Sequence, residues 1–234
     1  MGKVTKYFHS NIFNKSFEYH LLKPDHPIND ANILYVQDGN DYLELGEFEE
    51  AYRSCELASM TNWIIIFIHP GTSEERWQSY HHKGQLFNKY IDFMYEEFMP
   101  SVEQELDVKR ISKKGLLGDS LAANISLHIA ARKPEHWTHL LLQSAAIMKQ
   151  DIACIAGLKE AIPWNVYQTV GIYEDEFVSP ITNERLFIYT RNRELHEVFQ
   201  RKKVNVHFSE MAENHLWEFW KRDLPSALLF FLKS

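Results

Sequence analysis

The sequence predicts an α/β fold with a mostly parallel central sheet and helices on both faces. Short apolar runs alternate with amphipathic stretches along the whole chain. The run at residues 63–68 is apolar at every position, as in a central strand that helices cover on both faces. Small and polar residues follow these runs, and in such sheets they gather at the carboxyl ends of the strands. The length of 234 residues fits one domain of this class, spanning 1–234.

The N-terminal half of the chain predicts four strands and two helices. Two strands fill residues 3–24, with a turn at 11–15, and a buried strand at 31–37 ends at Asp38-Gly39-Asn40. A helix with an apolar side follows this strand, and the strand at 63–68 comes next. Residues 87–98 carry apolar side chains at three- and four-residue spacing, which predicts an amphipathic helix that ends before Pro100.

The C-terminal half continues the alternation of strands and helices. A strand leads to Gly118, and a helix begins at the next turn and runs to about Lys133, before Pro134. Further strands are predicted at 140–142, 166–170 and 204–208, and helices at 182–201 and 216–231. No repeat or low-complexity tract interrupts the pattern, so we expect one continuous sheet.

Composition and charge exclude several classes of partner. The net charge of −7 favours neither nucleic acid nor an anionic membrane surface. Cys55 and Cys154 lie too far apart for a metal motif and form no disulfide framework, which fits a reducing compartment. The N-terminal residues lack the apolar segment of a signal peptide, and the longest apolar run is too short to span a bilayer. We therefore expect a cytoplasmic protein that does not bind membranes.

The turn at Gly118-Asp119-Ser120-Leu121-Ala122 points to a nucleophile. A serine at the tip of a tight strand-to-helix turn exposes its hydroxyl above the sheet, and the next backbone N–H faces an incoming carbonyl oxygen. A side chain at position 118 would collide with the turn, so glycine is needed there. The alternative is that Ser120 only caps the helix.

Groups with complementary chemistry follow the other strands. A serine at 120, acids at 174–176 and a histidine at 215 come off successive strands in that order, which is the order of a triad in the α/β-hydrolase fold. His215 suits the role of general base because an imidazole titrates near neutrality, at about pH 6.5. The adjacent pair His81-His82 has no partner at ligand spacing, so no metal is predicted.

Four segments resemble the putative esterase family, the esterase D or enterochelin-esterase-like branch of the α/β-hydrolases. They are Ile33-Leu-Tyr-Val-Gln-Asp-Gly39, Phe98-Met-Pro-Ser-Val-Glu103, Leu117-Gly-Asp-Ser-Leu-Ala-Ala123 and Asn214-His-Leu-Trp-Glu-Phe-Trp220. The four segments are distributed along nearly the whole chain. The family usually has two glycines where this chain has Ala122 and Ala123, which could tighten the turn and lower activity.

The resemblance implies further site residues. By analogy with the family pattern, Asp175 is the acid of the triad, with Glu174 as the alternative. The backbone N–H of Leu121 would form one half of the oxyanion hole, and Asn40 or Gly39 would supply the other half. The structural alternative for the last pair is a plain turn. Gly39 and Trp217 are expected to contact the substrate.

The letters Gly118-Asp119-Ser120-Leu121 also spell the signature of the GDSL lipases, but in that family an Asp stands three residues before the histidine, where this chain has Ala212. The sequence therefore predicts a serine carboxylesterase that acts on a small-molecule ester through an acyl-enzyme, without cofactor or metal. The alternatives are an acyltransferase with the same triad and a hydrolase-fold binding protein of weak activity. The oligomeric state is open, with a homodimer as one option.

Overall fold

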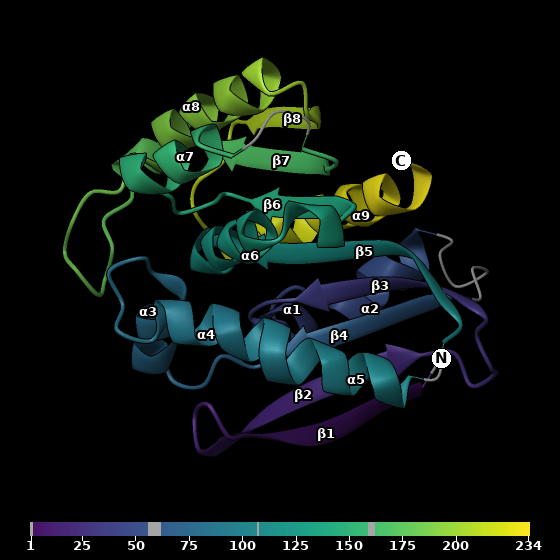
Figure 1. Ribbon diagram of the computed structural model, residues 1–234. Helices are drawn as coiled ribbons and strands as arrows, with labels where there is room; N and C mark the ends of the chain where they lie inside the picture. Colours follow the sequence, from purple (N-terminus) through teal and green to yellow (C-terminus); the bar gives the residue numbers. More distant parts are fainter. Residues whose placement is uncertain (1, 56–61, 107, 159–161) are drawn as a thin grey trace.

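The computed structural model describes residues 2–55, 62–106, 108–158 and 162–234, which form one eight-stranded sheet with helices on both faces (Figure 1). The strand order is β1-β2-β4-β3-β5-β6-β7-β8. Strands β1 and β2 are antiparallel to their neighbours, and the other six strands, β3 to β8, run parallel to one another. The strands are β1 (Gly2–Ser10), β2 (Lys15–Lys23), β3 (Asp30–Val36), β4 (Trp63–Ile68), β5 (Arg110–Asp119), β6 (His139–Gln143), β7 (Asn165–Gly171) and β8 (Asn205–Met211).

The helices form a layer on each face of this sheet. One face carries α1 (Gly39–Glu44), α2 (Phe48–Ser54) and α9 (Trp217–Lys233). The other face carries α3 (Ser73–Tyr80), α4 (Phe87–Phe93), α5 (Met99–Glu105), α6 (Ser120–Arg132), α7 (Lys149–Ala156) and α8 (Ile188–Arg201). This is the α/β-hydrolase arrangement that the sequence predicts.

Alternate residues of the central strands enter two separate cores. In β3, Ile33 and Tyr35 join the core under α4, α6 and α8, whereas Leu34 and Val36 join the core under α2 and α9. Side chains of a strand point alternately to the two faces, so a strand buried on both faces must be apolar throughout. The continuous apolar run in β4 follows from this position between two layers.

Two predicted helix boundaries are wrong. The helix expected to end before Pro100 passes through a π-helical turn at Met94–Phe98 and continues as α5. Pro100 is the second residue of α5 and directly follows the π-helical turn.

The helix predicted at 182–201 begins only at Ile188. The residues before it form a loop that is pinned by a bridge between Val178 and Arg185. Asn183 and Phe187 have positive φ angles of 55° and 53°, which interrupt a right-handed helix. Because the helix starts only after this loop, the loop residues can form part of the cavity described below.

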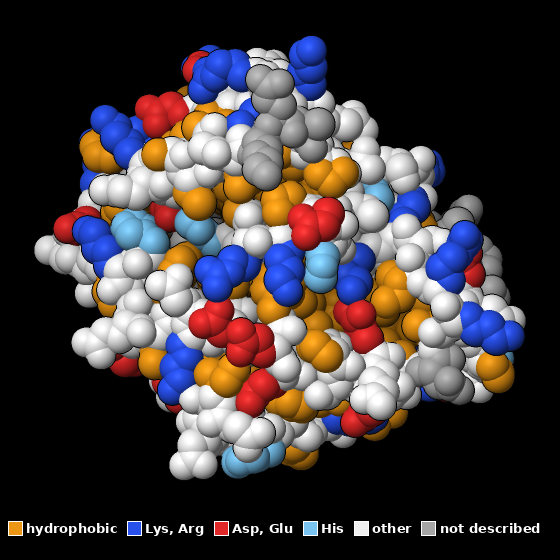
Figure 2. All heavy atoms as spheres, in the orientation of Figure 1, with side chains coloured by type: hydrophobic (Ala, Val, Ile, Leu, Met, Phe, Trp, Pro, Cys, Tyr) orange, Lys and Arg blue, Asp and Glu red, His pale blue; other side chains and the backbone are white. Residues whose placement is uncertain are grey.

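Charged side chains of both signs are interspersed on the face shown in Figure 2, and hydrophobic side chains are visible between them. Among the described residues, no helix combines the length and the apolar character needed to cross a bilayer.

Candidate active site

Ser120 lies where β5 ends and α6 begins, with a left-handed backbone φ of 47°. A residue other than glycine adopts this conformation at a cost in free energy, so the packing around the turn must hold it. A Cβ at Gly118 would lie 2.3 Å from the carbonyl carbon of Ala122. The collision predicted for a side chain at position 118 is confirmed, and the glycine allows the sharp turn that exposes the serine.

His215 and Glu174 continue a chain of hydrogen bonds from Ser120. The imidazole Nε2 lies 2.8 Å from the Ser120 hydroxyl oxygen, and Nδ1 lies 3.0 Å from Glu174 Oε2. His215 is 8% exposed and Glu174 is fully buried. The loop after β8 carries the histidine, and the short 3₁₀ turn Glu174–Glu176 after β7 carries the acid. Water therefore competes little for the imidazole–carboxylate contact.

Asp175, the acid expected to pair with His215, lies elsewhere. Its carboxylate accepts hydrogen bonds from the backbone N–H and the hydroxyl of Thr190, at 2.9 and 2.5 Å, in the first turn of α8. A carboxylate there caps the helix and complements its dipole. The neighbouring acid Glu174, which was the alternative, faces the histidine instead.

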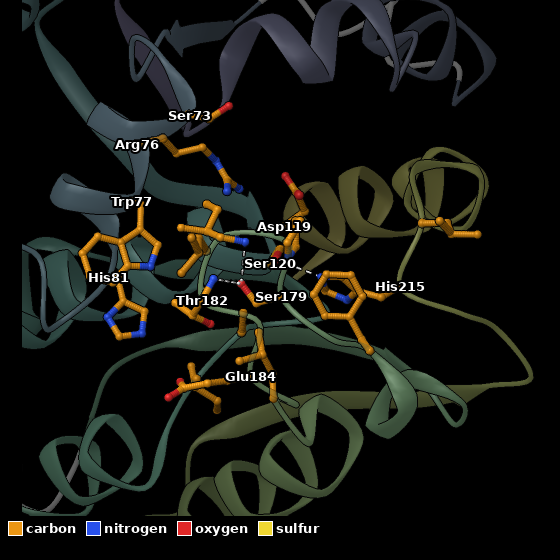
Figure 3. Close-up of a pocket in the computed structure, with 18 of the residues that line it drawn as sticks. Ser73, Arg76, Trp77, His81, Asp119, Ser120, Ser179, Thr182, Glu184 and His215 are labelled. Atoms are coloured by element: carbon orange, nitrogen blue, oxygen red, sulfur yellow. Dashed lines mark hydrogen bonds between the residues drawn. The ribbon is translucent and has the colours of Figure 1, made fainter.

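The hydroxyl of Ser120 opens into a cavity of about 340 Å³ (Figure 3). Its wall combines apolar side chains with polar and charged ones. The apolar residues include Ile147, Met148, Phe177, Ile181, Leu186, Leu216, Trp217 and Trp220, and the polar ones include Asp41, Ser73, Arg76, Asp119, Ser179, Thr182 and Glu184. Such a lining suits a small ligand that has both hydrocarbon and polar parts.

A partly buried charge cluster contributes to the cavity wall. Arg76 Nε donates to Asp38 Oδ2 at 2.6 Å, and its Nη2 contacts the same oxygen. Burial alone would lower the pKa of the Arg76 guanidinium, but the Asp38 carboxylate holds that pKa above its usual value. Burial, and after it the Asp38 charge, raises the pKa of Asp119 well above its usual range.

The residues expected in the oxyanion hole occupy helix N-termini. Leu121 is the second residue of α6 and lines the cavity. The first intrahelical bond of α1 runs from the Tyr42 N–H to the Asp38 carbonyl, which leaves the N–H of Asn40 without a helical acceptor. Gly39 packs against β4, where a Cβ would lie 2.6 Å from the backbone of Ile68. Neither Gly39 nor Asn40 is among the described residues that line the cavity, whereas the next residue, Asp41, is.

Trp217 lines the cavity as expected, and so does Trp77. Trp164 is buried in the core, where its Nε1 donates to the Pro134 carbonyl at 3.0 Å. Tyr173 is half exposed outside the cavity wall.

Three parts of the cavity wall were missed from the sequence: Arg76, His81 and the loop 177–186. The segment Thr72-Ser-Glu-Glu75 is a capping box that could have revealed α3, which carries Arg76. Burial, and then the neighbouring His82, lowers the pKa of His81 to about 4, so this wall residue is an uncharged imidazole at neutral pH. No group of three or more metal-ligating side chains occurs within the described parts of the chain.

The chain is 26% identical over 231 residues to the uncharacterised protein YjcH of Bacillus subtilis (strain 168), which covers 95% of this chain and 94% of that protein. Its fold is similar to that of enterochelin esterase from Shigella flexneri, with a TM-score of 0.81 and 13% identity, over all of this chain but only 59% of the other. The BES protein from Bacillus cereus matches with a TM-score of 0.74 and 20% identity, over 99% of this chain and 96% of the other.

A ferulic acid esterase has the same fold, with a TM-score of 0.75 and 17% identity, over 98% of this chain and 97% of the other. At these identities, the solved structures show the fold. The family model described as Putative esterase matches residues 10–231, which is nearly the whole chain. The chain therefore belongs to the Putative esterase family, with the α/β-hydrolase fold, and ester hydrolysis is the activity that this membership supports.

Proposed function

We propose that the protein is a serine carboxylesterase that forms an acyl-enzyme on Ser120. The observation that carries the proposal is the continuous chain of hydrogen bonds from Ser120 through His215 to Glu174, at the wall of a cavity. A serine hydroxyl becomes a nucleophile when a base takes its proton, and a buried acid keeps that base in the right tautomer. Family membership and the strained turn at Ser120 support the same assignment.

In the acylation step, Ser120 Oγ attacks the ester carbonyl carbon while His215 Nε2 takes the hydroxyl proton. The carbonyl oxygen gains the negative charge, which the N–H of Leu121 and a second N–H from the start of α1, at Asn40, stabilise. Each such donor contributes about 3 kcal/mol to the transition state. The bond to the alcohol oxygen then breaks, and His215 returns its proton to that oxygen.

Hydrolysis of the acyl-enzyme repeats these steps with water. His215 takes a proton from a water molecule that attacks the acyl carbonyl, and the proton passes to Ser120 Oγ as the acyl bond breaks. Glu174 faces Nδ1 throughout and stabilises the imidazolium that forms in each half-reaction. No cofactor takes part in this scheme.

The substrate that we propose is a small ester with an apolar or aryl group. The cavity of about 340 Å³ lies near the lower end of the usual range for ligand pockets, which is roughly 300–1,000 Å³. Its wall includes Phe177, Trp217 and Trp220, which suit a flat hydrocarbon group. The aromatic ester named for one structural neighbour, ferulic acid esterase, supports an aryl group.

The experiment that tests the proposal is the intact mass of the protein after exposure to a fluorophosphonate. We expect one adduct on the wild type, none on Ser120→Ala and slow formation on His215→Ala. Short-chain and aryl p-nitrophenyl esters would then give the rate of turnover, and an added alcohol would reveal acyl transfer. A folded wild type that forms no adduct would exclude the esterase and favour a binding protein with this fold.

A further inference from the structure

Ser144 follows β6 and is fully buried beneath the reacting groups. Its backbone is left-handed, with φ at 49°, and its N–H donates to the Thr169 carbonyl of β7 at 2.8 Å. This conformation costs free energy for a residue with a Cβ, and such strain persists only where the surrounding structure enforces it. It places the Ser144 side chain against the carboxylate of Glu174.

The Ser144 hydroxyl lies between two partners whose chemistry fixes its direction. Trp220 Nε1 lies 2.9 Å from Ser144 Oγ, and Glu174 Oε1 lies 2.6 Å from it. An indole N–H can only donate, so the hydroxyl oxygen accepts from Trp220. The single hydroxyl proton is then left for Glu174. The tryptophan therefore sets the serine as a donor to the acid.

The two oxygens of Glu174 consequently have separate tasks. Oε1 accepts from Ser144 Oγ and from the backbone N–H of Gly171, at 2.6 and 3.0 Å. Oε2 faces His215 Nδ1. Two donors on one oxygen resist rotation of the carboxylate, and hydrogen bonds to a charged group are the stronger kind. The oxygen that meets the imidazole is thus held in place from behind.

The same loop also reaches the nucleophile. The N–H of Ala146, two residues after Ser144, donates to the Ser120 carbonyl at 2.9 Å. The Trp220 ring meets the His215 imidazole edge-on, with ring centres 4.9 Å apart. The chain Trp220–Ser144–Glu174 therefore connects to the reacting groups at both ends.

We propose that Ser144 is a positioning residue for the esterase reaction, acting through Glu174 and oriented by Trp220. This inference rests on the proposed function. Ser144 is not among the described residues that line the cavity, so the loss of its hydroxyl should leave substrate binding intact. Without the hydroxyl, the Glu174 carboxylate loses a donor and turns more freely away from His215.

The test compares Ser144→Ala with Ser10→Ala, a matched control. Ser10 is also a fully buried serine whose hydroxyl donates to a glutamate, Glu97, but it lies at the end of β1. For Ser144→Ala we expect kcat to fall roughly tenfold and KM to change by less than about twofold. The acid limb of the pH–rate profile, which reports protonation of the base, should move to lower pH, because a carboxylate that turns away stabilises the imidazolium less. Ser10→Ala should leave both unchanged.

Trp220→Phe removes the indole N–H, which frees the Ser144 hydroxyl to rotate. The acid limb should move in the same direction as in Ser144→Ala, but by less. If Ser144→Ala and the wild type have the same kcat and the same acid limb, the positioning role is wrong. A loss in Ser144→Ala that is matched by Ser10→Ala, with no change of the acid limb, would also overturn it, because stability alone would then explain the loss.

Two further measurements separate this proposal from the proposed function. The rate of fluorophosphonate labelling reports the reactivity of Ser120 without a substrate, and failure of the wild type to react overturns the esterase itself. The downfield proton resonance of His215 Nδ1 reports its contact with Glu174 without any reaction. We expect this resonance to shift or broaden in Ser144→Ala but not in Ser10→Ala, and an unchanged resonance in Ser144→Ala would overturn the role of Ser144 whatever the labelling shows.

Discussion

Glu174 and Asp175 are neighbours in sequence, yet their carboxylates point in different directions and bind different partners. Glu174 is fully buried and bonds to His215 and Ser144, whereas Asp175 bonds to the first turn of α8. Their chemistry is nearly identical. The difference between a catalytic candidate and a helix cap here comes from direction alone.

We predict that Glu174→Gln lowers kcat by roughly 10³-fold or more, because an amide no longer stabilises the imidazolium and can hold the imidazole in the wrong tautomer. The matched change Asp175→Asn should keep kcat and reduce the free energy of unfolding by about 1 kcal/mol through the weakened cap. Steady-state kinetics and urea denaturation of both variants check the pair. Equal losses of kcat would contradict the assignment of Glu174.

At the scale of elements, the junction of β5 and α6 carries Ser120, the proposed nucleophile, in a sharp turn that Gly118 allows by letting the helix pass close to the strand. The atom nearest to a Cβ at this position belongs to the backbone of Ala122, which cannot swing away. The turn therefore depends on the glycine even though Ala122 and Ala123 stand where the family usually has glycines.

We predict that Gly118→Ala lowers the free energy of unfolding by about 1–3 kcal/mol or more, because the added methyl group collides with the backbone. Gly157→Ala is the matched control, since its Cβ would meet only carbonyl oxygens at 3.4 and 3.5 Å, in ordinary contact. That change should be neutral or slightly stabilising. Urea denaturation curves measure both, and a stable Gly118→Ala protein would show that the turn relaxes.

The sequence predicted the strands and the placement of Ser120 and His215 because these features have local signals. The apolar run of β4 and the turn at Gly118 depend on residues close together in the chain. The choice between Glu174 and Asp175 has no such signal. It depends on how the loops after β7 and β8 meet, where the Tyr173 N–H donates to the Glu213 carbonyl.

The loop 177–186 was also not predicted from the sequence, for a related reason. Thr182, Asn183 and Glu184 are residue types that are common at the start of a helix, but the bridge between Val178 and Arg185 holds this segment as a loop. Contacts distant in sequence therefore decide the shape of the cavity, whereas local patterns decide the scaffold that carries it.

At the scale of the whole molecule, several buried histidines link stability to pH. Burial lowers the pKa of His81 and of His139 to about 4, so both are neutral in the folded protein. Burial opposes the charge on His128 as well, but its hydrogen bond to Asp151 raises that pKa to about 9. His81 and His139 therefore reduce the free energy of unfolding at acidic pH, whereas His128 reduces it at alkaline pH.

We predict a maximum of stability near neutral pH. His81 and His139 contribute above the unfolded pKa of about 6.5, and this contribution is lost as pH falls toward 4. His128 contributes below about 6.5, and its contribution is lost as pH rises through about 9. Urea midpoints from pH 4 to 10 measure both limbs. His128→Gln should flatten only the alkaline limb, and an unchanged limb would contradict the His128–Asp151 account.

The residues of the proposed site follow four neighbouring strands: Ser120 follows β5, Ser144 follows β6, Glu174 follows β7 and His215 follows β8. Ser120 and His215 are 95 positions apart. At the usual pace of translation, the ribosome makes the histidine roughly 5 to 20 seconds after the serine. Throughout that interval the nascent chain carries the serine without its proposed base, so the mechanism that we propose requires β8 and the loop after it to complete the site.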